Sequence, residues 1–553
     1  MAQTLRERCQ RRLEGLKKTR QPYEDEAKEI AGFCQPARSR WLSTDQNKNS
    51  RQRNKRLNNS HGIFAMRTLQ GGMTSGLSSP SRPWFTLQTF DDELNEDPAI
   101  KAWLAEAERL VYAFLAGTNF YGAAKAGYLE LGMFGTEACV MVEHRVQGAV
   151  CHQATFGEYW IGLGDAMMPD SLYRRCPMTV VQAVQSFDRS KLRPAIVSAY
   201  DAGRYEEVCD FYHAIEPNDE FDDQYDDARG MPFRSVYWDA DASGASSILR
   251  VSGFREQPFW APRWETAGGD AWGTGPGHDA LPDLRELQLQ TRRKGEATDN
   301  AIWPEIIVPA QIKLRRQPKS VVSAAQMDKD AVQVPYQVPY QAIQVIGEDV
   351  RRCEEAIDRA TYADLFMAIT NMNGIQPRNI EEIAARNEEK LTQLGPVIER
   401  VNNEKLQVAI DRAFGIMQRG NLLPPAPDAI REAGGEIKVE FVSILTQMQR
   451  MVGLGQIERT VGFIGNLAAV NPEALDKLDV DEAIDEYASR AGTPPKLIRS
   501  DKDVEQIRSD RAEQQNMERM IAAAPAAKDG AQAAAVLAEA SDGALPLAGA
   551  MPL

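Results

Sequence analysis

Apolar residues recur with helical spacing through much of the first 131 residues. The pattern predicts helices over residues 3–33 (one helix or a pair), 61–77 and 98–131. Pro98 stands at the expected first residue of the third helix, where a missing backbone N–H leaves no hydrogen bond unmade. The apolar stripe of this helix consists of Ile100, Trp103, Leu104, Ala107, Leu110, Val111 and Phe114.

Residues 136–260 change to short runs of β-branched and aromatic residues separated by turn residues. Runs such as ACVMVEHRV, EYWIGLG and MTVVQAVQSF predict strands. The clearest hairpin is FRSVYW followed by the turn DADASGAS and the returning strand SILRVSGF. We therefore expect a β-rich region between the helices before it and those after it.

Two helical stretches then flank a proline-punctuated segment. The pattern predicts helices over residues 279–299 and 347–368, and a β-like segment over residues 301–345 that contains PEIIVP and VPYQVPYQ. A helix of about 20 residues spans roughly 30 Å. Two helices of similar length joined by a short β-like insertion indicate a hairpin of helices.

A long helix is predicted over residues 379–420. Asn379 is placed as its N-cap with Glu382 in capping-box position, Gly395–Pro396 should kink it, and Gly420 should end it. A short strand, IKVEFVS, and acidic helices follow to about residue 512. The Ala-rich last residues suit either a helix or a disordered tail. The fold class that this order predicts is α+β, predominantly helical.

The charge balance argues against a protein that coats nucleic acid. The 553 residues carry a formal net charge of −15, whereas tight non-specific DNA binding requires a cationic surface. Residues 1–60 depart from this balance, with 15 Lys/Arg against 7 Asp/Glu. A basic segment on an acidic body predicts charge complementarity between subunits; an exposed basic helix is the equally plain alternative.

Cysteine usage and hydropathy predict a protein that is made and kept in the cytoplasm, or in something assembled there. The seven cysteines form no C-x-x-C pair, which indicates buried thiols instead of a disulfide framework. The basic N-terminal stretch has no apolar core and is not a signal peptide. We find no run of about 20 apolar residues and expect no membrane span.

Motifs for catalysis or cofactor binding are missing. There is no G-x-x-x-x-G-K-[ST] phosphate loop, no H-E-x-x-H and no G-x-S-x-G. Cys209 with His213 could touch a metal but lies at no zinc-finger spacing, and Asp239–Gly244 resembles a calcium loop without its final glutamate. We expect no enzyme activity, no metal and no cofactor.

Four strings carry a resemblance to a known family. They are GGMTSGLSSPSRPWFTL at 71–87, TNFYGAAKAGYLELGMFGTEA at 118–138, GIQPRNIEEIAARNEEKLTQLGPVIERVNNEKL at 374–406 and DVDEAIDEYASRAGTPPKLIRSDKDV at 479–504. In this order they resemble podovirus-type bacteriophage head-to-tail connector, or portal, proteins. The resemblance covers roughly residues 10–510 and is weakest over 300–345 and beyond 512.

The resemblance implies a ring-forming, portal-like subunit with wing, stem, clip and crown. The implied parts are a wing over 1–277, stem helix 1 over 278–299, a clip over 300–346, stem helix 2 over 347–366, a channel loop over 367–378, a long kinked wing helix over 379–420, a crown over 421–512 and an Ala-rich tail or barrel helix over 513–553. The hairpin of helices predicted from periodicity agrees with a stem that leads to a projecting clip.

The resemblance also implies partners and a location. Subunits, typically twelve, would surround an axial channel at one unique capsid vertex of the virion, after assembly in the host cytoplasm. The ring would contact major capsid and scaffolding proteins, dock terminase and later tail adaptor proteins, and pass double-stranded DNA without reading its sequence. No membrane and no cofactor would be involved.

Two groups of residues are candidate sites within this scheme. Basic residues in and beside the clip are candidates for docking acidic partner surfaces or DNA phosphate; the alternative is an ordinary solvated basic face. They are Arg292, Arg293, Lys294, Lys313, Arg315, Arg316 and Lys319. Short polar residues of the channel loop are candidates for brushing the duplex; the alternative is a plain loop between helices. They are Asn371, Asn373, Gly374, Gln376 and Arg378.

Two other functions remain open from the residues alone. A helical virion scaffold or interaction protein without a channel would also have many helices and no active site. An enzyme of the packaging machine would need a nucleotide or metal site, and the missing phosphate loop argues against the motor itself.

Overall fold

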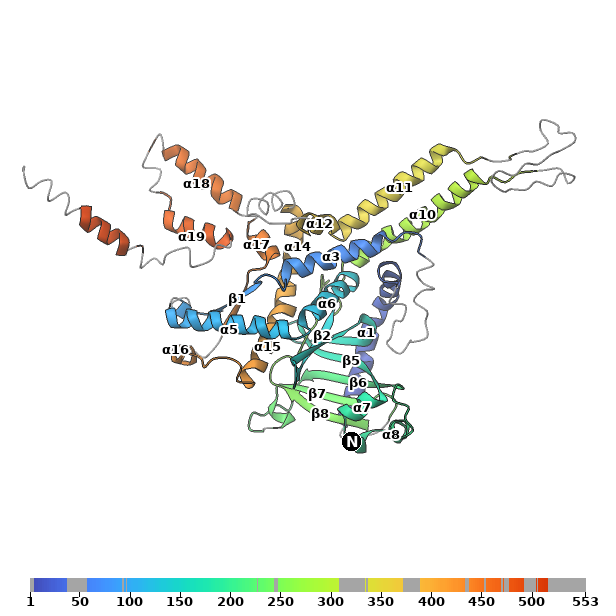
Figure 1. Ribbon diagram of the computed structural model, residues 1–553, viewed down its shortest axis with the longest axis horizontal. Helices are drawn as coiled ribbons and strands as arrows, with labels where there is room; N and C mark the ends of the chain where they lie inside the picture. The colour runs from blue at the N-terminus through green and yellow to red at the C-terminus, as the bar shows by residue number, and fades with distance from the viewer. Residues whose placement is uncertain are drawn as a thin grey trace, which may run out of the picture. The chain divides into compact units, whose positions relative to one another are not determined.

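The structure is a computed structural model of the 553-residue chain, and it divides into two compact units, residues 1–452 and 453–553. The residues that it describes are 4–36, 57–91, 94–95, 97–225, 227–242, 247–307, 334, 337–370, 388–432, 437–451, 454–468, 471, 477–491, 504 and 506–515. The fold is α+β and predominantly helical, as the sequence predicts, with antiparallel sheets in the first unit (Figure 1).

The N-terminal region is one continuous helix, α1 (Leu5–Cys34), and not a pair. It begins at a capping box, in which the Thr4 side chain accepts a hydrogen bond from the Glu7 backbone and the Glu7 carboxylate accepts one from Thr4. The helix continues through Pro22. Its buried face packs against the sheet and helices of the first unit.

Three further helices form the centre of the first unit, at or close to the predicted positions. They are α3 (His61–Leu77), α5 (Pro98–Gly117) and α6 (Phe120–Phe134). Asp97 caps α5 ahead of Pro98, as the proline position predicts. The stretch predicted as one helix over 98–131 is two, because the chain breaks at Thr118 and Asn119 before α6 begins.

The β-rich region contains two antiparallel sheets (Figure 1). A five-stranded sheet has the order β4-β5-β6-β7-β8, and a three-stranded sheet has the order β3-β2-β9. The bounds are β2 Ala138–His144, β3 Gly148–Ala154, β4 Tyr159–Leu163, β5 Pro169–Thr179, β6 Val208–Pro217, β7 Phe233–Asp239, β8 Ile248–Phe254 and β9 Phe259–Trp260. The predicted hairpin is confirmed, since β7 pairs antiparallel with β8.

One predicted strand in this region is wrong. Most of the run MTVVQAVQSF is helix α7 (Val180–Ser186), and α8 (Pro194–Asp201) follows it. The Thr179 side chain accepts a hydrogen bond from the Gln182 backbone, and the Gln182 side chain accepts one from Thr179. This capping box starts a helix that β-branched composition alone does not reveal. Short 3₁₀ turns cover Phe156–Glu158, Arg189–Lys191 and Ala228–Gly230.

The predicted strand near residue 440 exists, and its partner is distant in sequence. β10 (Ile437–Phe441) pairs antiparallel with β1 (Phe85–Thr89), with Phe85 opposite Phe441. Helix α17 (Ile444–Met451) follows β10 and contacts α3 and α14, and the short α16 (Asp428–Glu432) precedes it. The first unit therefore extends through residue 452 and includes this late segment.

The hairpin of helices is present, with bounds that differ from the predicted ones. A short α9 (Pro276–Asp279) precedes α10 (Leu281–Ile302), and α11 (Tyr340–Ala360) packs against α10. Residues 340–346, predicted as β-like, are helical, because Pro339 holds extended backbone at the N-cap and the helix begins directly after it. α12 (Ala363–Thr370) follows after Tyr362, whose φ is 53°.

The long helix predicted over 379–420 is described from residue 388 onward. It consists of α14 (Glu388–Val401), a π-helical turn (Asn402–Gln407) and α15 (Val408–Arg419), and it ends at Gly420 as predicted. Helix α14 continues through Pro396, and the departure from α geometry lies in the π turn after it. The predicted N-cap, Asn379, lies outside the described residues.

Ion pairs at and beyond the π turn tie this helix to the β region. The side chains of Lys405 and Glu137 are both 0% exposed, with Nζ and Oε1 2.8 Å apart. Glu404, which directly precedes Lys405, accepts two hydrogen bonds from the guanidinium of buried Arg263, at 2.6 and 3.3 Å. Further along, buried Arg412 donates to Glu256 at 2.6 Å. Burial raises the pKa of Glu137 and lowers that of Lys405, and the opposite charge of each partner counteracts both shifts.

Two glycines leave space for the buried carboxylate of Glu137 and the partly buried carboxylate of Glu256. A Cβ on Gly127 of α6 would lie 2.1 Å from Oε2 of Glu137, and a Cβ on Gly415 of α15 would lie 2.1 Å from Oε1 of Glu256. The Lys405 ammonium also lies 3.6 Å from the centroid of the Tyr128 ring, which adds a cation–π contact. The helix register is thus set by charge pairing as well as by apolar packing.

The second unit contains helices α18 (Leu454–Ala468) and α19 (Val480–Ala491), which contact each other. They fall within the stretch predicted as acidic helices. In the first unit, all seven cysteines of the chain are free, in agreement with the expected absence of a disulfide framework.

We predict that Lys405→Met alone destabilises the protein by about 3–5 kcal/mol, because it leaves the Glu137 carboxylate buried without a cation. The double variant Glu137→Leu/Lys405→Met should recover most of that loss, since apolar residues of similar volume replace the pair. Chemical denaturation of the purified full chain measures both. Arg292→Met, which removes an exposed ion pair with Glu296, is the control and should change little. A fully stable Lys405→Met variant would contradict the role of the pair.

Candidate functional site

The base of the α10–α11 hairpin is anchored in the core of the first unit. Leu281, Leu284 and Leu287 of α10 are buried, as are Val350 and Ile357 of α11. Apolar residues nearer the far ends of the two helices are exposed instead. They are Leu289 (43% exposed), Ile302 (65%), Tyr340 (72%) and Val345 (57%). The hairpin therefore has a fixed base and an apolar far part that this chain does not cover within its described residues.

The segment before α3 holds the two helices together. The Gln288 side chain of α10 accepts hydrogen bonds from the backbone N–H groups of Asn58 and Asn59, at 2.8 and 3.1 Å. The Asn59 amide donates to Glu354 of α11 at 2.9 Å, and His61 lies 2.8 Å from the carboxylate of Asp358. The segment 58–61, which is far from both helices in the sequence, thus binds α10 and α11 to each other.

The predicted docking residues are only partly within the described chain. Arg292, Arg293 and Lys294 are exposed on the last turns of α10. Arg292 pairs with Glu296 one turn away at 2.8 Å, and Lys294 lies across from Gly347 of α11. Lys313, Arg315, Arg316 and Lys319 lie outside the described residues. The docking role of the seven residues stays a prediction.

The predicted channel-loop residues all lie outside the described residues. These are Asn371, Asn373, Gly374, Gln376 and Arg378. The first four residues of the predicted loop, 367–370, are helical instead and belong to α12, and the described chain resumes at α14. The contact of the loop with DNA stays a prediction.

The basic residues of α1 are largely paired within their own chain. The guanidinium groups of Arg8 and Arg12 both reach the buried carboxylate of Glu216 on β6, at 3.7 and 3.0 Å. Arg20 is buried, donates to the carbonyl oxygens of Phe156 and Tyr159, and pairs with Glu24 at 2.7 Å. Burial lowers the pKa of Arg20, while Glu24 opposes that shift. Several basic side chains of α1 therefore attach this helix to the sheet and are not free for other partners.

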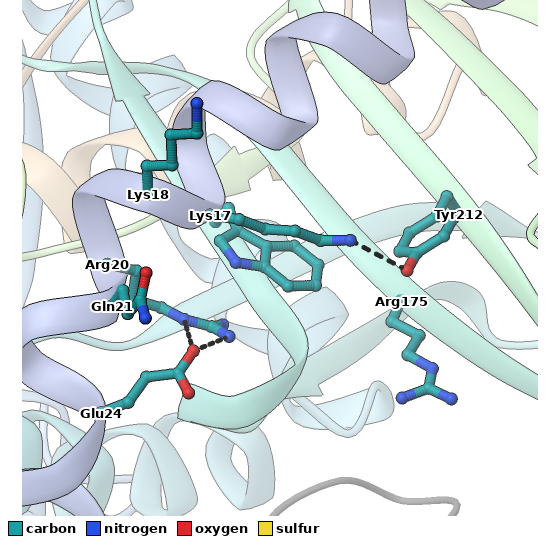
Figure 2. A pocket seen from close by; sticks show the side chains of 8 residues that line it. Lys17, Lys18, Arg20, Gln21, Glu24, Arg175 and Tyr212 are labelled. Atoms are coloured by element: carbon teal, nitrogen blue, oxygen red, sulfur yellow. Dashed lines mark hydrogen bonds and ion pairs between the residues drawn. The ribbon is translucent and has the colours of Figure 1, made fainter.

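A pocket of about 370 Å³ lies where α1 crosses the five-stranded sheet (Figure 2). Its lining comes from α1, β4, β5 and β6, and consists of Lys17, Lys18, Arg20, Gln21, Glu24, Trp160, Arg175 and Tyr212. Arg175 and Tyr212 are opposite each other in the β5–β6 pairing. Four cations and one carboxylate make the pocket positive, and two aromatic rings form part of its wall.

The cations of the pocket differ in how fully they are paired. The Lys17 ammonium donates to the Tyr212 hydroxyl at 3.2 Å and lies 5.2 Å from the Trp160 ring centroid (Figure 2). Arg175 pairs with Asp210 at 2.5 Å. Among the described residues, neither Lys17 nor Lys18 has a carboxylate partner. The Trp160 indole N–H is buried and makes no hydrogen bond there either. The pocket therefore has uncommitted donors and suits an anionic group.

A search of the described residues for other chemistry gives two further results. They contain no group of three or more His, Cys, Asp or Glu side chains placed to hold a metal ion. Their helices include none with the length and apolar character to cross a membrane.

Sequence reasoning missed both the pocket and the buried ion pairs. The pocket is formed by a helix and by three strands that come more than 100 residues after that helix in the sequence, so no local motif marks it. The buried pairs had one visible signal: Glu404 and Lys405 interrupt the predicted apolar stripe between Val401 and Ile410. Adjacent charges within a buried helix indicate partners elsewhere in the chain.

Comparison with known proteins gives consistent results. A family model described as bacteriophage head to tail connecting protein matches residues 6–498. The portal protein of Salmonella phage epsilon15 is 34% identical over 537 residues, which are 96% of this chain and 96% of that protein. The probable portal protein of Bordetella phage BPP-1 is 36% identical over 507 residues, 90% of each chain. The match spans both the helical and the β regions, and the chain belongs to the family of bacteriophage head to tail connecting proteins.

Proposed function

We propose that this chain is the portal subunit of a short-tailed phage, and that its subunits form a ring with an axial channel for genome packaging and ejection. The observation that carries the proposal is similarity over almost the whole chain to a portal protein and to a probable one. The role is structural and not enzymatic, as the names of the family and of its relatives describe a part of the virion. The ring would be assembled in the host cytoplasm.

A ring at the unique capsid vertex of the virion would have several partners. The ring, of about twelve subunits, would contact capsid and scaffolding proteins, dock terminase during packaging, and bind tail adaptor proteins afterwards. Double-stranded DNA would pass through it without sequence-specific contacts. The net charge of −15 supports passage without tight adhesion, since phosphate-binding surfaces are cationic.

The parts of the portal are assigned along the chain as follows. Residues 1–277 and 379–420 form the wing, 278–299 and 347–366 the stem, 300–346 the clip, 367–378 the channel loop, 421–512 the crown, and 513–553 a tail or barrel helix. The packed pair α10 and α11 supports the stem assignment, because the clip segment joins their far ends. Exposed apolar residues on the far part of the pair suit contacts with neighbouring stems.

A closed ring of subunits is the most direct consequence of this function. Electron micrographs of the purified protein, classified in end-on view, should show closed rings with a hole wide enough for a B-form duplex, roughly 20 Å or more. Solid oligomers without a hole would contradict the proposal and favour a scaffold without a channel. Heterologous contacts between identical subunits form a closed ring when the rotation between neighbours closes, and a scaffold without a channel has no need of such closure.

Charge reversal in the clip tests the docking role of its basic residues. Arg315→Glu/Arg316→Glu should abolish capture of terminase or adaptor by the ring, because like charges facing each other across an interface cost several kcal/mol. A pull-down with purified partners measures it. Arg109→Glu, at an exposed position on α5 that is already paired with Glu106, is the comparison variant and should have the smaller effect. Unchanged capture by the double variant would remove the docking role.

A short deletion tests the role of the channel loop. Deleting residues 371–374 should leave rings intact but should lower either packaging or the retention of packaged DNA, because the loop is proposed to contact the duplex. Packaged DNA per particle, measured by nuclease protection, is the readout. If both packaging and retention match the wild type, the loop is only a connection between helices.

A further inference from the structure

The pocket beside α1 has a complementary feature on the same chain. The loop after β6, residues 218–225, contains Asp219, Glu220, Asp222 and Asp223, and we call it the acidic loop. Its Phe221 side chain is 49% exposed and its Tyr225 side chain is 43% exposed. Acidic and aromatic groups thus alternate on the loop, and the pocket combines cations with aromatic walls.

The free charges of the two features also match. Glu220 and Asp223 have no cationic partner among the described residues. Lys17 and Lys18 in the pocket have no carboxylate partner among them. Pairing these groups would satisfy charges that the single chain leaves unmatched.

The acidic loop does not fill the pocket of its own chain. Asp219 at the start of the loop lies 3.5 Å from Arg8 of α1. Lys17 is nine residues further along the same helix, about 13 Å away at 1.5 Å per residue. The loop is therefore held near the beginning of α1, and none of its residues lines the pocket of its own chain.

We propose that the acidic loop of one subunit binds in the α1 pocket of the next subunit. This inference rests on the proposed ring, and it assigns one of the contacts that close it. Loop and pocket are different surfaces of one chain, so each subunit presents its loop to one neighbour and its pocket to the other. Such heterologous contacts generate closed rings when the rotation between neighbouring subunits closes, and open filaments when it does not.

The dimensions and composition of the pocket favour this occupant over nucleic acid. A volume of about 370 Å³ is at the small end of the range for ligand sites, and accepts one or two side chains of a loop. Trp160 is only 4% exposed and offers little face for stacking a base.

Charge reversal on either side tests the contact. Lys17→Glu/Lys18→Glu reverses the pocket, and Glu220→Lys/Asp223→Lys reverses the loop. Each double variant alone should raise the concentration needed for half-maximal ring assembly by about tenfold or more, because like charges then face each other. Mass photometry of the full-length chain, with electron micrographs of the products, measures assembly.

Two combinations then separate a lost contact from a damaged subunit. A mixture of the two variants should form rings in which they alternate, since each reversed pocket meets a reversed loop. A chain that carries all four substitutions should assemble alone. Lys101→Glu/Lys125→Glu, which reverses two exposed charges outside the pocket and the loop, is the control and should assemble like the wild type.

Three outcomes would overturn the contact. In the first, both double variants form rings at the wild-type concentration. In the second, both fail and neither the mixture nor the fourfold variant recovers, although circular dichroism shows folded protein. In the third, the pocket variant forms normal rings but loses binding of a short DNA duplex, which identifies nucleic acid as the occupant. Wild-type chains that form no ring, even with capsid partners, would instead overturn the proposed portal function.

Discussion

A fully buried lysine–glutamate pair, Lys405 with Glu137, constrains how the parts of the first unit meet. Neither charge can be buried without the other, because an isolated ion in the protein interior costs several kcal/mol. Glu137 stands between α6 and β2, and Lys405 stands in the π turn of the long helix. The pair therefore fixes the helix, the three-stranded sheet and α6 at one point. Glu404 with Arg263, and Arg412 with Glu256, repeat that constraint on either side.

The same network leads toward the helix hairpin. Arg400, two residues before the π turn, donates to the carbonyl oxygen of Trp264 at 2.9 Å. The Trp264 ring lies 6.1 Å from the ring of Tyr362, which joins α11 to α12. Buried ion pairs contribute little net stability compared with apolar packing, but they penalise every alternative register. We interpret the network as a means of holding α10 and α11 in one orientation on the rest of the first unit.

The local elements were predictable from sequence where a cap or a clear period marked them. His61–Leu77, the start of α5 at Pro98 and the β7–β8 hairpin follow from such signals. The helix α7 was mistaken for a strand because its β-branched residues outweighed the capping box at Thr179. The pairing of β1 with β10 joins residues about 350 positions apart, and no local pattern encodes it. The pocket and the attachment of α1 to Glu216 were missed for the same reason.

We propose that α10 and α11 form the stem around a DNA channel. A cryo-electron-microscopy reconstruction of the assembled ring, at a resolution that separates helices, tests this arrangement. We expect the α10–α11 pairs of all subunits to surround the rotation axis, packed side by side through residues such as Leu289 and Val345, with a hole wide enough for a duplex. A ring whose axis is lined by other elements, or an assembly with no axial hole, would contradict it.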